Sequence, residues 1–218
     1  MDDALDTEDS SEKKEKTIYY VTDENQQSQY INMFKKAKMD AVMLKHNIDQ
    51  PFITQLEAKN EGIRFKRIDA DIEEALKTKT SKKVQEELEE KAGGLKELFK
   101  KALKVKEIDL SLEKLKDKKT ASMITLSEES RRMQDMMKMY SMPGMDPNMF
   151  GGEGEKLILN VNHPLVEYLI ENKDTEDASL FAEQLYDLAK IQQAPLKPEE
   201  MTKFIQRSND ILLKLSEK

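Results

Sequence analysis

The chain has 218 residues with no cysteine and no tryptophan, and charged residues (36 %) are nearly as frequent as hydrophobic ones (38 %). Without cysteine there is no disulfide, thiol or thiolate metal chemistry. The net charge of −7 excludes a general nucleic-acid binder with a basic surface. No apolar run approaches the roughly 20 residues that a membrane span needs. We therefore expect that neither nucleic acid nor a membrane is a partner, and that the protein is cytoplasmic.

The N-terminal third predicts a small αβ unit. Residues 1–16 are acidic and then mixed in charge, with no apolar signal-peptide core, and predict a disordered lead or linker. Residues 17–72 then alternate between apolar strand patterns and amphipathic helix patterns. Strands are expected at 17–22, 41–44 and 63–68, and helices at 25–38 and 49–59. This order predicts a three-layer αβα subdomain with a largely parallel sheet, in which strand 41–44 is covered on both faces.

A second domain is expected after a charged connecting helix at 73–93. Gly93 and Gly94 are predicted to interrupt that helix and to mark the domain boundary. The segment 94–218 then predicts a mixed α/β domain. Its expected elements are a helix at 95–103, strands at 105–115, 121–126 and 156–161, and a helix that Asn162, His163 and Pro164 open. The predicted class is therefore α+β or α/β.

The last two helices carry the strongest periodic pattern. Asp177 is placed to cap the first, and Pro198 opens the second. Their apolar sides are broader than one partner helix covers, which favours a homodimer through a four-helix bundle over packing on their own domain. The predicted dimer interface consists of Phe181, Leu185, Leu188, Ile191, Phe204, Ile205, Ile211, Leu212 and Leu215.

Methionine is concentrated between Ala121 and Phe150, where eight of the thirteen lie. A helix is expected at 130–140, with Arg131 and Arg132 on its polar side, and it leads into a loop rich in glycine and proline. Methionine surfaces repack against many shapes and favour adaptable binding sites, although such a stripe can equally face the core of its own domain. The predicted binding residues of this segment are Met133, Met136, Met137, Tyr140, Met142, Met145, Met149 and Phe150.

No pattern in the sequence predicts a catalytic, cofactor or metal site. The segment GGEGEK at 151–156 fails as a phosphate loop, because its glutamates repel phosphate and a strand follows where a helix is needed. His46 and His163 have no second ligand at helical spacing. Two alternatives to a binding module stay open: an enzyme with a small ligand at the edge of the parallel sheet near 22–25 and 45–49, and a plain dimeric scaffold.

Two parts of the sequence resemble the heat-shock protein 90 family of chaperones in its bacterial form. The run from Tyr19 to Asp71 is similar to the small αβ subdomain that ends the middle domain of that family. The strand 121–126, the helix 130–140, the segment LNVNHPLVE at 159–167 and the terminal helices resemble its C-terminal dimerisation domain. The order of these elements and the Asn162-His163-Pro164 helix entry are the specific features.

The resemblance implies a chaperone whose ATPase domain is not part of this sequence. In this family an N-terminal domain binds and hydrolyses ATP with magnesium, and the larger part of the middle domain supplies a catalytic arginine. Neither part is in this sequence, so the chain looks like the C-terminal third of such a protein and is expected to be no enzyme by itself. The resemblance places a homodimer seam on 181–215 and contact with unfolded or partly folded client proteins on 133–140.

Overall fold

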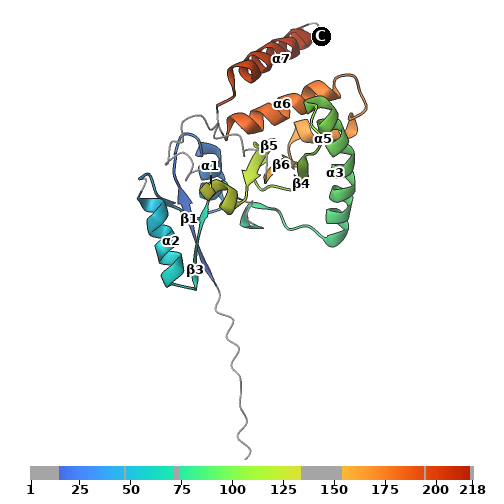
Figure 1. Ribbon diagram of the computed structural model, residues 1–218. Coiled ribbons are helices and arrows are strands. Elements are labelled where there is room, and N and C mark those ends of the chain that lie inside the picture. The colour runs from blue at the N-terminus through green and yellow to red at the C-terminus, as the bar shows by residue number, and fades with distance from the viewer. Residues whose placement is uncertain (1–14, 47, 71–73, 134–153, 194, 217–218) are drawn as a thin grey trace, which may run out of the picture.

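The computed structural model describes residues 15–46, 48–70, 74–133, 154–193 and 195–216. Two three-stranded sheets lie next to each other with helices around them, and the C-terminal helix lies farthest from the first sheet (Figure 1). The protein is therefore a mixed α/β structure of the α+β class. None of the helices in these ranges is long and apolar enough to cross a membrane. Residues 1–14 of the predicted lead lie outside the described residues.

The first sheet has the strand order β2-β1-β3, and both pairings are parallel. Its elements are β1 (Lys16–Val21), α1 (Ser28–Lys36), β2 (Val42–Met43), α2 (Asp49–Lys59) and β3 (Ile63–Arg67). Parallel neighbours need a crossover connection, and α1 and α2 provide one each. The largely parallel sheet that the sequence predicts is therefore present.

Helices cover both faces of this sheet. Tyr20 packs with Ile53 of α2, whereas Val21 packs with Tyr30 and Phe34 of α1. Successive residues of a strand point to opposite faces, so α2 lies on one face and α1 on the other. The unit consequently has three layers, helix, sheet and helix.

The strand predicted at 41–44 is not covered on both faces. Val42 and Met43 are 45 % and 40 % exposed. β2 has only these two residues and forms an edge of the sheet, while β1 is the central strand. A continuous apolar run indicated burial here, but an edge position leaves one side of the strand open to solvent.

The long helix α3 (Lys82–Leu103) runs without a break through Gly93 and Gly94. The predicted interruption, and with it the end of a connecting helix at residue 93, is wrong. A glycine inside a helix costs about 1 kcal/mol. Leu95 and Phe99 are fully buried, and each such side chain contributes about 1.5–3 kcal/mol, which outweighs the two glycines. The division into domains at 17–72 and 94–218 stays a proposal.

The second sheet has the order β4-β6-β5. Its strands are β4 (Asp109–Glu113), β5 (Ser122–Leu126) and β6 (Glu155–Asn160). β6 is central and pairs parallel with β4 and antiparallel with β5. All three strands occur where the sequence predicts them, although β4 is shorter than the predicted segment 105–115.

One face of the second sheet carries the largest hydrophobic core. Leu112, Ile124 and Leu159 point into it from the three strands, and Phe99 of α3 and Leu185 of α6 meet them there. The helices that close this core are α3, α5 (Pro164–Glu171) and α6 (Ala178–Ile191). At the start of α5, Nδ1 of His163 accepts a hydrogen bond from the backbone N–H of Leu165 at 3.2 Å, so this histidine is the helix cap.

The other face of the second sheet joins it to the first unit. Met123 of β5 and Ile158 of β6 pack in one cluster with Tyr30, Met33 and Phe34 of α1. The chain also forms an isolated parallel bridge between residues 70 and 126. The α1 layer is therefore shared by both sheets and links them through a common apolar core.

Candidate functional site

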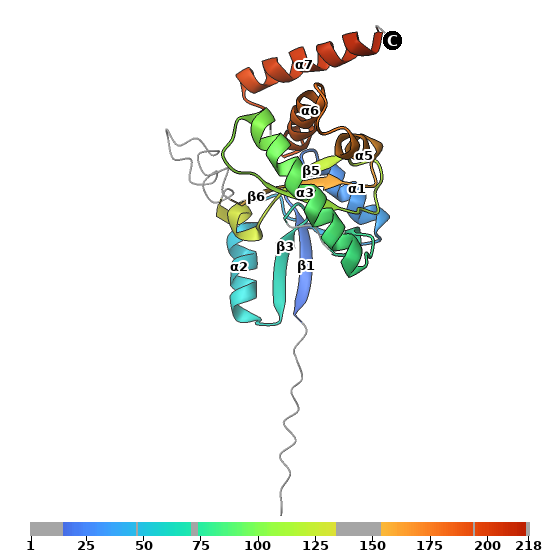
Figure 2. The ribbon, with the colours of Figure 1, turned by 90° about the vertical axis from the view of Figure 1, so that its right-hand side faces the viewer.

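The last helix, α7 (Pro198–Ser216), lies next to α6 at the outside of the molecule, at the top of Figure 2. Its contacts with α6 run in opposite chain directions: Lys190 meets Glu200, Arg207 meets Asp187, and Lys214 meets Asp177. The two helices are therefore antiparallel, as the sequence predicts. Every one of these pairs is polar.

Arg207 is the centre of this helix pair. It is the one residue of α7 that is buried, and it donates to Glu183 at 2.7 Å, to Gln184 at 2.9 Å and to Asp187. Ser208 accepts a further hydrogen bond from Gln184 at 3.2 Å. A guanidinium with several charged and polar partners orients two helices specifically, because its donors form a rigid planar fork.

The apolar side of α7 is left without a partner in the described part of the chain. Ile205, Leu212 and Leu215 are 51 %, 64 % and 61 % exposed. We name Ile205, Leu212 and Leu215, together with the half-buried Phe204 and Ile211, the α7 face. Large contiguous apolar surface on a helix is a feature of protein interaction sites.

The four predicted interface residues of α6 differ in their burial. Leu185 is 2 % exposed and belongs to the core of this chain, so it is a correction to the predicted interface. Phe181 is half-buried and its ring lies 5.1 Å from that of Tyr168 of α5. Leu188, at 37 % exposure, and the half-buried Ile191 remain accessible from outside. The helical period alone does not separate the side that faces the sheet from the side that faces out.

The predicted client helix begins at 128, where Ser127 caps it by accepting from the backbone N–H of Ser130 at 3.2 Å. Met133 is 46 % exposed. The other predicted client-binding residues lie outside the described residues: Met136, Met137, Tyr140, Met142, Met145, Met149 and Phe150. The structure therefore places the base of this helix and one of its eight predicted contact residues.

Arg132 fastens the base of this helix to the first sheet. Its guanidinium makes two hydrogen bonds to Glu57 of α2, at 2.6 and 3.0 Å, and one to the carbonyl of Phe65 at 2.9 Å. It also donates to Glu128 at 2.9 Å. The hydrogen bond to Glu57 is the main cause that raises the pKa of Arg132. Glu128 in turn accepts from the hydroxyl of Tyr20 at 2.8 Å.

Arg131 reaches into a buried polar junction between both sheets and α6. It lies 3.6 Å from Asp69, which also holds Arg67 by two hydrogen bonds of 2.6 and 2.8 Å. On its other side Arg131 donates to Gln193, just after α6, and Gln193 donates to the hydroxyl of Tyr30. Three parts of the chain far apart in sequence thus meet at one guanidinium.

The positions of Arg131 and Arg132 differ from those that the sequence predicts. Both were expected on the solvent side of the methionine helix, but Arg131 is 3 % exposed and Arg132 is half-buried. Gln193 and Glu57, the long-range partners of Arg131 and Arg132, lie about sixty or more residues away in the chain and cannot be predicted from local spacing. The pair of Arg132 with Glu128, in contrast, has helical spacing. The polar side of this helix is therefore an anchor at its base rather than a solvated surface.

The alternative ligand site at the edge of the parallel sheet has a limited structural basis. An open hollow between α1 and β2 is lined by Glu24 and Met43 among others, but no residue of 45–49 contributes to it. No group of three or more acidic or histidine side chains suited to a metal ion occurs in the described ranges. Its lining includes Glu24, Asp40, Lys35 and Ser28, but no hydrogen bond or ion pair joins the side chains of any two of them in the described part of the chain, as a coupled acid, base and nucleophile would require.

Comparison with known proteins places the chain among chaperones. The family model described as Hsp90 protein matches residues 7–217. The chaperone protein HtpG of Bacteroides fragilis is 28 % identical over 203 residues, which is 88 % of this chain and 29 % of that protein. HtpG of Porphyromonas gingivalis is 28 % identical over 207 residues, covering 88 % and 30 %, and that of Wolinella succinogenes is 30 % identical over 187 residues, covering 81 % and 28 %.

The chain thus spans less than a third of the length of these relatives. The family match runs through both sheets, the anchored helix base and the antiparallel α6–α7 pair. This chain belongs to the Hsp90 family of chaperone proteins.

Proposed function

We propose that this chain is the dimerising and client-contacting portion of an ATP-dependent chaperone that assists protein folding. Family membership supports the chaperone role. ATP and magnesium belong, on this proposal, to a domain that these residues do not include, and the chain itself performs no catalysis. A cytoplasmic location remains a prediction.

The observation that carries the dimer is the α7 face. A helix that ion pairs and hydrogen bonds hold to its own chain and whose apolar side is largely exposed gains most by burying that side against another copy. Leu188 and Ile191 of α6 extend the same proposed interface. Two copies of the antiparallel α6–α7 pair would make a four-helix bundle around a two-fold axis.

The oligomeric state tests this directly. Multi-angle light scattering of the intact chain at micromolar concentration should give twice the mass of one chain. A chain that ends before residue 194 lacks α7 and should elute as a monomer, while its circular dichroism keeps the signal of the two sheets. A monomeric mass for the intact chain would refute the dimer.

Client contact is proposed for the methionine-rich segment. Exposure of Met133 supports it, because the apolar side chain at the anchored base of the helix faces solvent. The anchoring by Arg131 and Arg132 supports it as well, since a contact site on a fixed base keeps its position relative to the dimer. Unfolded or partly folded proteins are the proposed partners, because methionine surfaces adapt to many shapes.

A triple replacement of Met136, Met137 and Tyr140 by serine separates binding from stability. If these residues bind clients, the melting temperature should change little while suppression of client aggregation falls. If they are core residues, truncation of each should cost about 2–5 kcal/mol, and a large fall in melting temperature would contradict the proposal. Unchanged aggregation suppression at unchanged stability would also contradict client binding by these residues, whereas no suppression by the unaltered chain would favour the plain dimeric scaffold.

A further inference from the structure

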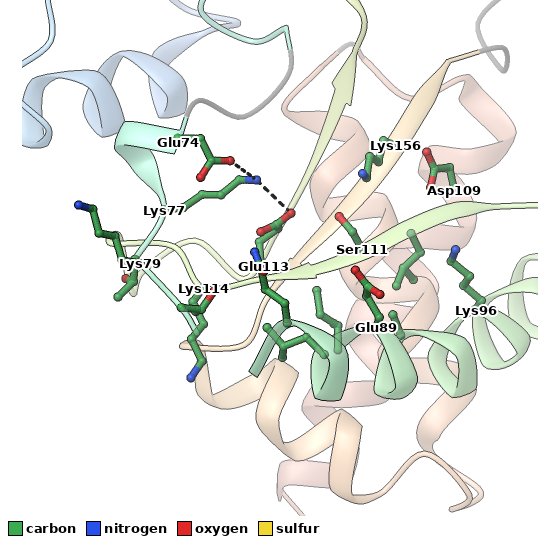
Figure 3. Close-up of a pocket in the computed structure, with 17 residues that line it drawn as sticks. Glu74, Lys77, Lys79, Glu89, Lys96, Asp109, Ser111, Glu113, Lys114 and Lys156 are labelled. Carbon is green, nitrogen blue, oxygen red and sulfur yellow. Dashed lines mark hydrogen bonds and ion pairs between the residues drawn. The ribbon is translucent and has the colours of Figure 1, made fainter. Parts of the chain in front are cut away.

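A groove of about 690 Å³ runs along β4, the outer strand of the second sheet (Figure 3). α3 forms one wall through Gln85, Leu88 and Glu89, and the segment 74–80 forms the other. All five residues of β4 line the space between them. We name this space the β4 groove. It lies apart from the α7 face and from the base of the client helix.

The open side of β4 is a template for another strand. Among the described residues β4 pairs only with β6, so its outer edge has no strand beside it. Just past β4 the chain already uses this edge. The backbone N–H of Thr78 donates to the carbonyl of Lys114 at 2.7 Å, and that of Lys116 donates to the carbonyl of Leu76 at 3.0 Å. These bonds form an isolated antiparallel bridge between Lys77 and Leu115. Strand pairing therefore begins at the end of this edge, while the stretch 109–113 has no strand beside its outer edge in the described part of the chain.

The charges around the groove favour an acidic occupant. Lys77 is held by Glu74 at 3.0 Å and by Glu113 at 3.3 Å. Of the remaining ionisable groups in the lining, four are lysines and two are acidic, and none of the six has an ion pair within the described ranges. They are Lys79, Lys96, Lys114 and Lys156 against Glu89 and Asp109. The lining as a whole has five lysines and four acidic residues, a net positive charge of one in a chain of net charge −7. The four lysines outside the Lys77 group are the groups that attract carboxylates.

One side of the groove is apolar and the other is polar, which suits the two kinds of side chain on an alternating strand. Leu110 and Leu112 point to the side of α3, where Leu88 and Ala92 line the groove. Ser111 alternates to the other side, and its hydroxyl is buried with no hydrogen-bond partner in the described part of the chain. An extended peptide presents successive side chains to opposite sides. Apolar residues would meet Leu88, and carboxylates in the alternate positions would meet the Ser111 hydroxyl and Lys156.

We propose that the β4 groove binds an extended acidic segment of another polypeptide, which adds as a further strand to the free edge of β4. Main-chain hydrogen bonds supply affinity in this binding mode, and the alternate side chains supply selectivity. The lysines favour a segment with acidic side chains. The apolar wall formed by α3 favours apolar side chains at the alternate positions of the same segment. This binding does not depend on the dimer or on the methionine-rich segment.

A labelled peptide tests the proposal with the intact chain. The probe is a fluorescein-labelled peptide in which glutamate and valine alternate, and fluorescence anisotropy reports its binding. A peptide with lysine in place of glutamate should not bind. The same acidic peptide with a methyl group on every second backbone nitrogen should bind at least about tenfold more weakly, because it lacks the donors that pair with the edge. Equal binding of the methylated peptide would overturn the proposal.

Charge variants locate the site. Lys96→Glu with Lys114→Glu should weaken binding of the acidic peptide by at least about tenfold. The matched control is Lys91→Glu with Lys101→Glu, two exposed lysines of α3 outside the lining, with the same change of net charge. It should leave the affinity within about twofold.

Amide hydrogen exchange of the unaltered chain gives a readout that does not depend on any variant. Bound peptide should slow exchange in 109–113. Equal weakening by both charge pairs, or protection on α7 in place of β4, would contradict the proposal. Should the Lys96 and Lys114 variant fail to fold, the methylated peptide and the exchange map decide the outcome.

Discussion

Asp69 is the charge on which the junction between the two sheets depends. It is 2 % exposed and lies between the guanidinium groups of Arg67 and Arg131, which are also buried. Two buried cations share one carboxylate here, and Gln193 contacts the second of them. Removal of one partner from such a group leaves uncompensated charge in the interior, which is far more costly than the loss of a surface pair.

Asp69→Asn should lower the free energy of unfolding by about 3–5 kcal/mol, because both guanidinium groups lose the negative charge of this carboxylate while the side chain keeps its size. Urea unfolding at neutral pH measures this loss. Glu24→Gln is the control, since Glu24 and Lys45 form an ion pair of 3.1 Å whose side chains are 57 % and 50 % exposed, and it should change stability by less than about 1 kcal/mol. Equal effects of the two replacements would show that the junction is not a buried ionic centre.

The same carboxylate makes stability depend on pH in a defined direction. Burial alone raises the pKa of Asp69, but the hydrogen bonds from Arg67 and the charges of both arginines outweigh it and hold the pKa below its ordinary 3.8. The folded state therefore binds this proton less readily than the unfolded chain. The contribution of Asp69 is complete above the ordinary pKa and is lost as the pH falls through that value toward the lower folded pKa.

Between neutral pH and the acid range the intact chain should lose more stability than Asp69→Asn. The difference between the two proteins should shrink as the carboxylate becomes protonated. Urea unfolding at a series of pH values from neutral to below 4 gives both curves. Parallel curves across this range would contradict the assignment of the pH dependence to Asp69.

The sequence does not predict this junction, and the reason is physical. Arg131 and Arg132 follow the polar period of an amphipathic helix, which normally faces water. Their burial depends on Gln193, Asp69 and Glu57, which come from other elements. Local spacing reports which side of a helix is polar, but only the packing of distant elements decides whether that side is buried.

At the scale of elements, α3 shows how tertiary packing overrides local propensity. Two adjacent glycines favour a break in the helix. The helix continues because Leu95 and Phe99, which follow the glycines within the next two turns, are buried in the core. The positions of the strands, in contrast, follow from the sequence, since alternation and β-branched runs depend on short segments. The exception is β2, whose edge position follows from the strand order.

Gly93→Ala should raise the free energy of unfolding by about 0.5–1 kcal/mol, because a Cβ at this position meets no atom within 4 Å and the unfolded chain loses freedom. Gly94→Ala is the matched comparison and should gain less, since its Cβ would lie 2.9 Å from Nζ of Lys173, which must move aside. Thermal unfolding of both variants measures the difference. Destabilisation by Gly93→Ala would contradict a continuous helix.

At the scale of the whole molecule, the two sheets and α7 are held in different ways. The sheets share an apolar cluster that includes Met33 and Met123, so the first unit and the second sheet support each other. α7 is joined to the rest of the chain mainly by polar contacts of Arg207 and its neighbours, and its apolar face remains open. The family and the antiparallel end of the chain were predictable from sequence, whereas the sharing of the α1 layer was not.

On the proposed function, the α7 face joins two copies of the chain, and the variant Leu212→Glu tests this dimer. Leu212 is 64 % exposed in the single chain, so the replacement should leave the fold intact while it places a charge in the proposed interface. Gln206→Glu adds the same charge at an exposed residue on the opposite side of α7 and should have no effect on assembly. Sedimentation velocity at micromolar concentration should show a monomer for Leu212→Glu and a dimer for both Gln206→Glu and the unaltered chain. A dimer of unchanged affinity in Leu212→Glu would contradict the claim.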